Sequence, residues 1–139
     1  MRTIVTGVRD GKSCVVEEID STLQGGSMEM LSILDLDVAA LPSRPPGRGD
    51  FLDIQVPEGG LRCCRVSFPP EQEWAMHHTD TIDFHTVAAG SIDLILDDGL
   101  HHLTVGDSVI VSGVDHGWRS GPEGCVTSII VVATPAPQA

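Results

Sequence analysis

Six histidines lie between residues 77 and 116, and the rest of the 139-residue chain contains none. Imidazole side chains serve as metal ligands and as general acids or bases near neutral pH, so this clustering predicts a functional site. The histidines of most interest fall in two segments, 76–90 and 106–118. One predicted hairpin separates these segments, which would make them neighbours in a small antiparallel barrel.

Several mechanisms are excluded by residues that the chain lacks. It contains no tyrosine that could act as a phenolic acid. Its single lysine, Lys12, lies in a predicted N-terminal hairpin, which argues against a Schiff base inside a barrel. Neither a Gly-x-Ser-x-Gly motif nor a glycine-rich phosphate loop is present. The remaining chemistry is acid–base catalysis by histidine and aspartate or Lewis-acid catalysis by a metal, with Arg62, Arg65 and Arg119 as candidate anion-binding residues.

The net charge of the chain argues against two classes of binding partner. It has 20 acidic residues against 8 basic ones, for a formal net charge of -12. Such a field repels phosphate backbones and anionic lipids, so we expect neither a nucleic acid nor a membrane as partner. The first residues lack the long apolar stretch of a signal peptide, and a cytoplasmic location is therefore expected.

The sequence predicts that these residues are positioned by short strands, which are separated by turns rich in glycine, proline and aspartate. Asp10-Gly11 and 97–99 are predicted hairpin turns. Turn signals every 8–12 residues without helical spacers predict an all-β sandwich or barrel with little helix. The one candidate helix, 27–41, ends in an alternation that suits a strand equally well. Residues 42–50 carry three prolines and two glycines and predict a loop or mobile cover near the mouth of the barrel.

Short intervals separate His78, Asp83 and Gly90 in the first histidine segment, and Gly106-Asp107 precedes His116 by about ten residues in the second. With these residues the chain resembles the cupin superfamily over residues 61–133. His78, Asp83 and Gly90 match the intervals of the first cupin motif, and Gly106-Asp107 with His116 match the second. The pattern is most similar to small single-domain cupins that read H-x-T-x-T-x-D, L-D-D-G, G-D and H-x-W-R. The segments assigned to these patterns are 78–83, 96–99, 106–107 and 116–119.

The resemblance implies a fold and an assembly. The expected fold is a cupin jelly-roll β-barrel or sandwich that forms one domain over residues 1–139. Its core would span about 61–133, with N-terminal strands and a loop in 1–60 and a frayed tail at 134–139. A homodimer is expected, in which the N-terminal strands are shared with the partner or packed against it and cover exposed sheet edges.

The resemblance also implies a divalent metal held by His78, His116 and Asp83. Fe, Mn, Ni and Zn all suit such a set, and nothing in the sequence selects among them. Met76 stands where the first motif has its leading histidine, and Asp83 replaces its glutamate. The alternative is a metal-free barrel whose polar groups form a hydrogen-bonded network around an organic ligand. His77 should point to the face opposite His78, outside the barrel or at a subunit contact.

His85 and Asp83 are the predicted catalytic residues, because alternation along a strand places them on one face. His85 would act as the general acid and base, although a core histidine bonded to a neighbouring strand is the alternative. The predicted substrate contacts are Trp118, Met76 and Arg65.

Three functions follow from this site. The first is a metal-assisted lyase, dehydratase or isomerase that acts on a small organic substrate inside the barrel. The second is an Fe(II)-dependent oxygenase that uses the same ligands. The third is a cupin that binds a small molecule without catalysis.

Overall fold

The structure, a computed structural model, describes residues 1–138. The described chain contains strands and no helix, which confirms the predicted all-β class. The nine strands are β1 (Arg2–Arg9), β2 (Lys12–Asp20), β3 (Asp50–Phe51), β4 (Leu61–Phe68), β5 (Glu73–His78), β6 (Thr81–Leu96), β7 (Gly99–Thr104), β8 (Ser108–Val111) and β9 (His116–Ala133).

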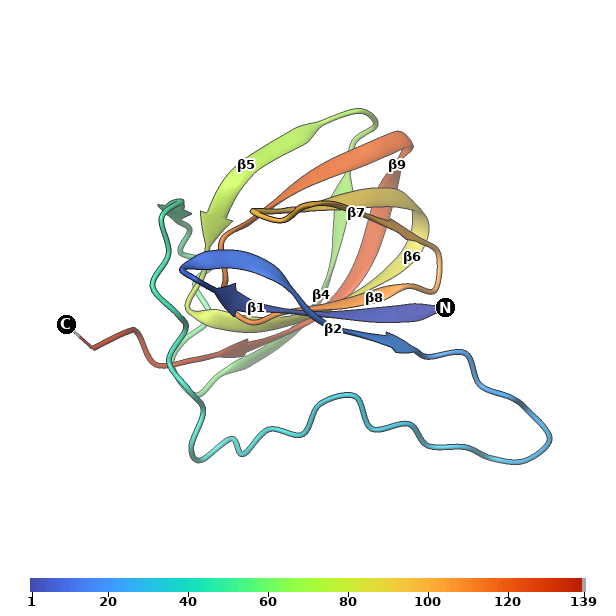
Figure 1. The fold of residues 1–139 in the computed structure, drawn as a ribbon, viewed down its shortest axis with the longest axis horizontal. Coiled ribbons are helices and arrows are strands. Elements are labelled where there is room, and N and C mark those ends of the chain that lie inside the picture. The colour runs from blue at the N-terminus through green and yellow to red at the C-terminus, as the bar shows by residue number, and fades with distance from the viewer. Residues whose placement is uncertain (139) are drawn as a thin grey trace.

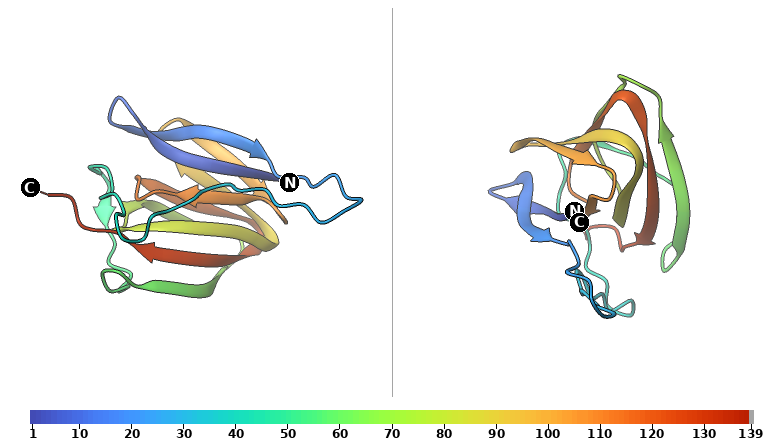
Figure 2. Two further views of the ribbon diagram at one scale, coloured as in Figure 1. Left: turned by 90° about the horizontal axis from the view of Figure 1, so that it is seen from below. Right: turned by 90° about the vertical axis from the view of Figure 1, so that its right-hand side faces the viewer.

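All nine strands belong to one sheet that curls into a barrel (Figures 1 and 2). The strand order is β2-β1-β8-β6-β9-β5-β3, with β4 added beside β9 and β7 beside β6. The pairs are antiparallel except β1 with β8 and β3 with β5. The right-hand view of Figure 2 shows the strands bending around a common interior, as the jelly-roll prediction requires.

Strands β6 and β9 are the longest strands, because each one bends near its middle and continues as a strand beyond the bend. The bends coincide at Gly90 and Gly124, which have φ angles of 70° and 74°. A Cβ on Gly90 would overlap the carbonyl oxygen of Gly124, so only glycine allows the two backbones to approach this closely. The β6–β9 register shifts on either side of Gly90, and such bulges increase the local bend of a strand. The two strands can therefore form both walls of the barrel.

The predicted turns form where expected. Asp10 and Gly11 both have positive φ angles and close the β1–β2 hairpin. The β6–β7 hairpin closes just before Gly99, whose φ is 130°. Buried aliphatic side chains from β1, β6, β7 and β8 form the core cluster, together with Phe68, Trp118 and Cys125.

Residues 27–41 form neither the predicted helix nor the alternative strand, and that expectation is wrong. The segment is irregular, with a single turn in which the Ala40 N–H donates to the Asp37 carbonyl. Met28 and Met30 remain more than nine-tenths exposed, so the apolar residues gain no packing that would stabilise a regular element. Figure 1 shows this segment passing outside the barrel.

No helix that could span a membrane occurs in residues 1–138.

Candidate functional site

The barrel encloses a partly open cavity of about 360 Å³. Its wall is mainly apolar, and three histidines and one aspartate interrupt it: His77, His85, His116 and Asp83. The remaining lining residues are Leu52, Ile54, Arg62, Cys64, Val66, Phe68, Trp74, Thr79, Trp118, Ile129 and Val131. An apolar cavity with a few convergent polar groups is the usual form of a small-molecule site.

Strand β6 supplies Asp83 and His85. Alternation along the strand points both into the cavity, and each side chain is less than a tenth exposed. Asp83 Oδ1 and both ring nitrogens of His85 are buried without a hydrogen-bond partner. The Asp83 Oδ2 to His85 Nε2 distance is 3.8 Å, too long for a hydrogen bond. The prediction that these residues share a face is confirmed, and the alternative of a core histidine bonded to a neighbouring strand finds no bond in the structure.

Strands β5 and β9 supply His77 and His116 from directly opposite positions in their register. The two ring centroids are 4.3 Å apart. On the same pair of strands Trp74 lies opposite Trp118. The step from Trp74 to His77 is three residues on β5, whereas the paired step on β9 is two residues, so β5 contains a β-bulge. This bulge reverses the alternation of β5 and points both Trp74 and His77 into the cavity. The expectation that His77 lies outside the barrel is wrong for this reason.

Backbone contacts fix the tautomers of these two histidines. The Nδ1 atom of His116 lies 2.9 Å from the Val114 carbonyl oxygen, and that of His77 lies 2.9 Å from the Ala75 carbonyl oxygen. A carbonyl only accepts, so each Nδ1 carries the proton and donates, which leaves Nε2 free. Burial, reinforced by the nearby His77, lowers the pKa of His116 to about 4. His116 is therefore neutral at pH 7, with an unprotonated Nε2.

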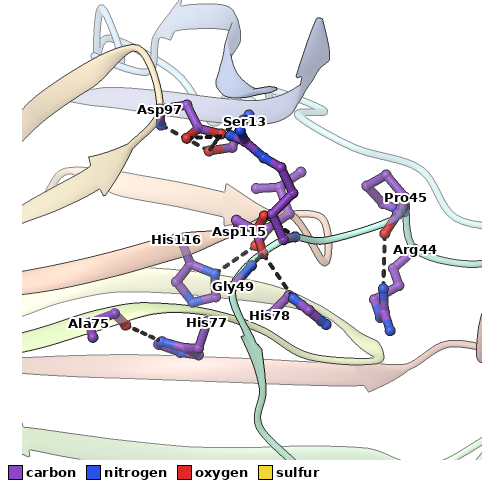
Figure 3. A network of polar contacts seen from close by, with 12 residues as sticks. Ser13, Arg44, Pro45, Gly49, Ala75, His77, His78, Asp97, Asp115 and His116 are labelled. Atoms are coloured by element: carbon purple, nitrogen blue, oxygen red, sulfur yellow. Dashed lines mark hydrogen bonds and ion pairs between the residues drawn. The ribbon is translucent and has the colours of Figure 1, made fainter. Parts of the chain in front are cut away.

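His78 lies outside the group that lines the cavity. It is buried instead beneath residues 47–51, where its Nδ1 donates to Asp115 Oδ1 at 2.8 Å (Figure 3). Asp115 also accepts the backbone N–H groups of Arg48 and Gly49, at 2.6 and 3.0 Å. Burial acts to raise the pKa of Asp115, but these hydrogen bonds outweigh it and hold the pKa below its usual value. His78 and Asp115 thus fasten this loop to the barrel.

Two of the predicted substrate contacts are placed differently from the expectation. Met76 is not among the cavity-lining residues, because the β5 bulge turns its neighbour His77 inward instead. Arg65 is exposed on the outer face of β4, beside Phe84 and Ile130. Arg62, three residues earlier on the opposite face, lines the cavity in its place. Trp118 lines the cavity as predicted, and its ring centroid lies 4.9 Å from that of His85.

The clustering of histidines has two origins. Three of them, His77, His85 and His116, face the cavity. The other three contact carboxylates elsewhere: His78 with Asp115, His101 with Asp98 and His102 with Asp93.

The predicted metal ligands do not form a metal centre. His78 binds Asp115 and does not line the cavity, whereas His116 and Asp83 do. Within residues 1–138, no three His, Cys, Asp or Glu side chains converge closely enough to hold a metal ion. His77 and His116 offer two free Nε2 atoms, and the orphaned oxygen of Asp83 does not join them in a common group. These donors therefore do not fit a metal site with three protein ligands.

Comparison with known proteins gives two kinds of match, and no family model matches the chain. Two curated relatives from Diaporthe leptostromiformis, phomopsin biosynthesis cluster proteins C' and D, are each 39% identical over 79 residues. The matched region is 56% of this chain and 38% of each relative, so the chain matches well under half of their length.

Solved structures match at the level of the fold. A protein of unknown function from Rhizobium leguminosarum bv. viciae 3841 is 18% identical, with a TM-score of 0.50 over 54% of this chain and 72% of that chain. An RmlC-like cupin from Shewanella frigidimarina NCIMB 400 is 25% identical, with a TM-score of 0.48 over 53% and 67%. The nine strands of this chain form one curled, mainly antiparallel sheet, with the Gly106-Asp107 turn before β8 and His116 at the start of β9. The chain therefore has the fold that the resemblance to cupins predicts, a curled jelly-roll barrel.

Proposed function

We propose that this chain binds a small organic molecule in the cavity and catalyses proton transfer on it, as an isomerase, dehydratase or lyase. The observation that carries the proposal is the unpartnered state of Asp83 Oδ1 and both nitrogens of His85. Leaving buried polar atoms without hydrogen bonds costs roughly 1–3 kcal/mol each. A ligand bound in the cavity would form the missing hydrogen bonds, which explains why these unpartnered atoms lie in the cavity wall.

The proposed chemistry uses the side chains in distinct roles. His85 removes a proton from a carbon beside a substrate carbonyl and returns it to another position, since a neutral imidazole offers one acceptor and one donor. Asp83, close to the same ring, stabilises the charge that forms on it. The neutral His116 accepts a hydrogen bond from a substrate hydroxyl at Nε2 and so orients the substrate. Trp74 and Trp118 provide the apolar wall.

The mechanism rests on these side chains and not on a metal. An Fe(II) oxygenase requires two histidines and a carboxylate that converge with open coordination positions. The donors in the described part of the chain do not form such a group, so proton transfer is the preferred function. The names of the two curated relatives associate them with a biosynthesis cluster, and an enzyme that processes a biosynthetic intermediate would fit the function that we propose.

Deuterium exchange tests the proposal without knowledge of the natural substrate. The protein is incubated in D₂O with a panel of small ketones, hydroxy acids and unsaturated acids, and NMR follows deuterium entering beside the carbonyl. We expect the wild type to accelerate exchange in at least one compound by 100-fold or more, the low end of what a positioned acid–base residue contributes. His85→Ala should lose that acceleration, and chelator treatment should leave it unchanged.

Three other results of the exchange experiment would contradict parts of the proposal. Binding without exchange would replace the enzyme with the non-catalytic binding cupin. Exchange that a chelator abolishes and a divalent metal restores would overturn the metal-free mechanism. Exchange that survives in His85→Ala would overturn the role of His85.

A further inference from the structure

Arg62 is the one lysine or arginine among the residues that line the cavity. It lies on β4, and the side chain is exposed at the edge of the cavity. Its Nη1 donates to the Ile54 carbonyl at 2.7 Å and its Nη2 to the Gln55 carbonyl at 2.9 Å. No carboxylate of residues 1–138 forms a salt bridge with it.

We propose that Arg62 binds a carboxylate of the substrate, so that the proposed function acts on small organic acids. This inference rests on the proposed function and specifies its substrate class. The guanidinium has five N–H donors, and its two backbone contacts leave donors free for a ligand. A carboxylate can take two of them side by side, which is a stronger contact than either neutral carbonyl provides.

The register of the sheet places Arg62 across the cavity wall from the proposed reaction centre. Arg62 pairs with Val131 of β9, and Val131 pairs with Asp83 of β6. Two strand spacings separate Arg62 from Asp83, or about 10 Å between their Cα atoms. The wall between them is apolar, with Val131 and Ile129 facing the cavity. A substrate held here would have its carboxylate at Arg62, an apolar middle and its reactive carbon at His85.

The charge of the site gives Arg62 a second role. Asp83 is buried in the same cavity, and the whole chain carries a formal net charge of -12. Both repel an anionic ligand. Because Arg62 is the cation of the cavity, it favours the binding of an organic acid over that of an uncharged ligand of the same shape.

Paired probes test this inference. Aromatic and aliphatic carboxylic acids of four to ten carbons are each compared with their primary amides, which have the same shape and no charge. NMR titration measures the Kd of each probe for the wild type, for Arg62→Gln and for the control Arg65→Gln. Arg65 is a matched control because it lies on the same strand with the opposite, outward orientation.

We expect the acids to bind at least tenfold more tightly than their amides to the wild type and to Arg65→Gln. Arg62→Gln should lose this preference while it still binds the amides, which shows that the cavity is intact. Equal binding of acids and amides to the wild type would overturn the inference and leave the proposed function standing. A preference that survives in Arg62→Gln, or a loss of amide binding in that variant, would also overturn it. If no probe of either kind shifts cavity resonances, the proposed function fails as well.

Discussion

We expect that replacing His85 with leucine makes the protein more stable and abolishes the proton exchange that we propose. Both ring nitrogens of His85 are buried without a partner, and leucine fills a similar volume without polar atoms. Removing these two unsatisfied nitrogens should raise the free energy of unfolding by about 1–3 kcal/mol for each of them. A gain in stability that accompanies a loss of function is typical of a residue retained for its chemistry.

Urea unfolding of the wild type and His85→Leu measures this effect, with exchange assayed on the same samples. His101→Leu is the control, because His101 already has a partner in Asp98 at 2.6 Å and lies away from the cavity. We expect no stabilisation from the control. If His85→Leu unfolds at lower urea than the wild type, His85 is a structural histidine and the catalytic assignment is wrong.

We expect the protein to lose stability as the pH falls from about 6.5 to about 4. The pKa of His116 is about 4 in the folded protein because of burial and the nearby His77, against 6.5 for an ordinary histidine. Between these values the unfolded chain binds more protons, so acid favours unfolding. The contribution of His116 is complete above pH 6.5 and is lost as the pH falls to about 4. A difference of about 2.5 pH units corresponds to about 3 kcal/mol.

His116→Gln isolates this contribution, because glutamine does not titrate. Free energies of unfolding are measured at intervals between pH 4 and pH 7 for both proteins. The difference between the wild type and the variant should change by about 3 kcal/mol across this range. Asp115 has a lowered folded pKa, so its own stabilisation is lost only at more acid pH, below the window. Parallel curves would show that His116 is not neutralised by burial.

The fold could be predicted because its signals are local. Asp-Gly turns, short apolar alternations and the Gly106-Asp107 motif each depend on neighbouring residues, and the structure forms those turns where they were expected. Residues 27–41 show the limit of such signals. Their apolar pattern suits a helix or a strand, but the structure offers them no surface on which to pack.

The site could be predicted on β6 and β9 but not on β5. Asp83, His85, His116 and Trp118 follow simple alternation and all reach the cavity. On β5 the bulge between Trp74 and His77 shifts the alternation by one residue, and a count from the motif alone selects the wrong histidine. The pattern H-x-T-x-T-x-D points to the cavity-facing histidine, because its histidine lies six residues before Asp83, at His77.

Two further features depend on contacts distant in the sequence. Asp115 binds His78 and the backbone of residues 48 and 49, and no local pattern indicates this arrangement. The choice between Arg62 and Arg65 depends on which face of β4 is turned inward. That face is set by pairing with β9, more than sixty residues later in the chain.

The most direct test of the account compares His77→Ala with His78→Ala. The Kd of the tightest-binding probe is measured by NMR titration for both variants, and their thermal unfolding is measured alongside. We expect His77→Ala to weaken binding at least tenfold with little change in Tm, because His77 faces the cavity and its backbone partner is exposed. His78→Ala should bind normally and unfold at lower temperature, since buried Asp115 loses a partner. The reverse pattern, with binding lost in His78→Ala and kept in His77→Ala, would contradict the site described above.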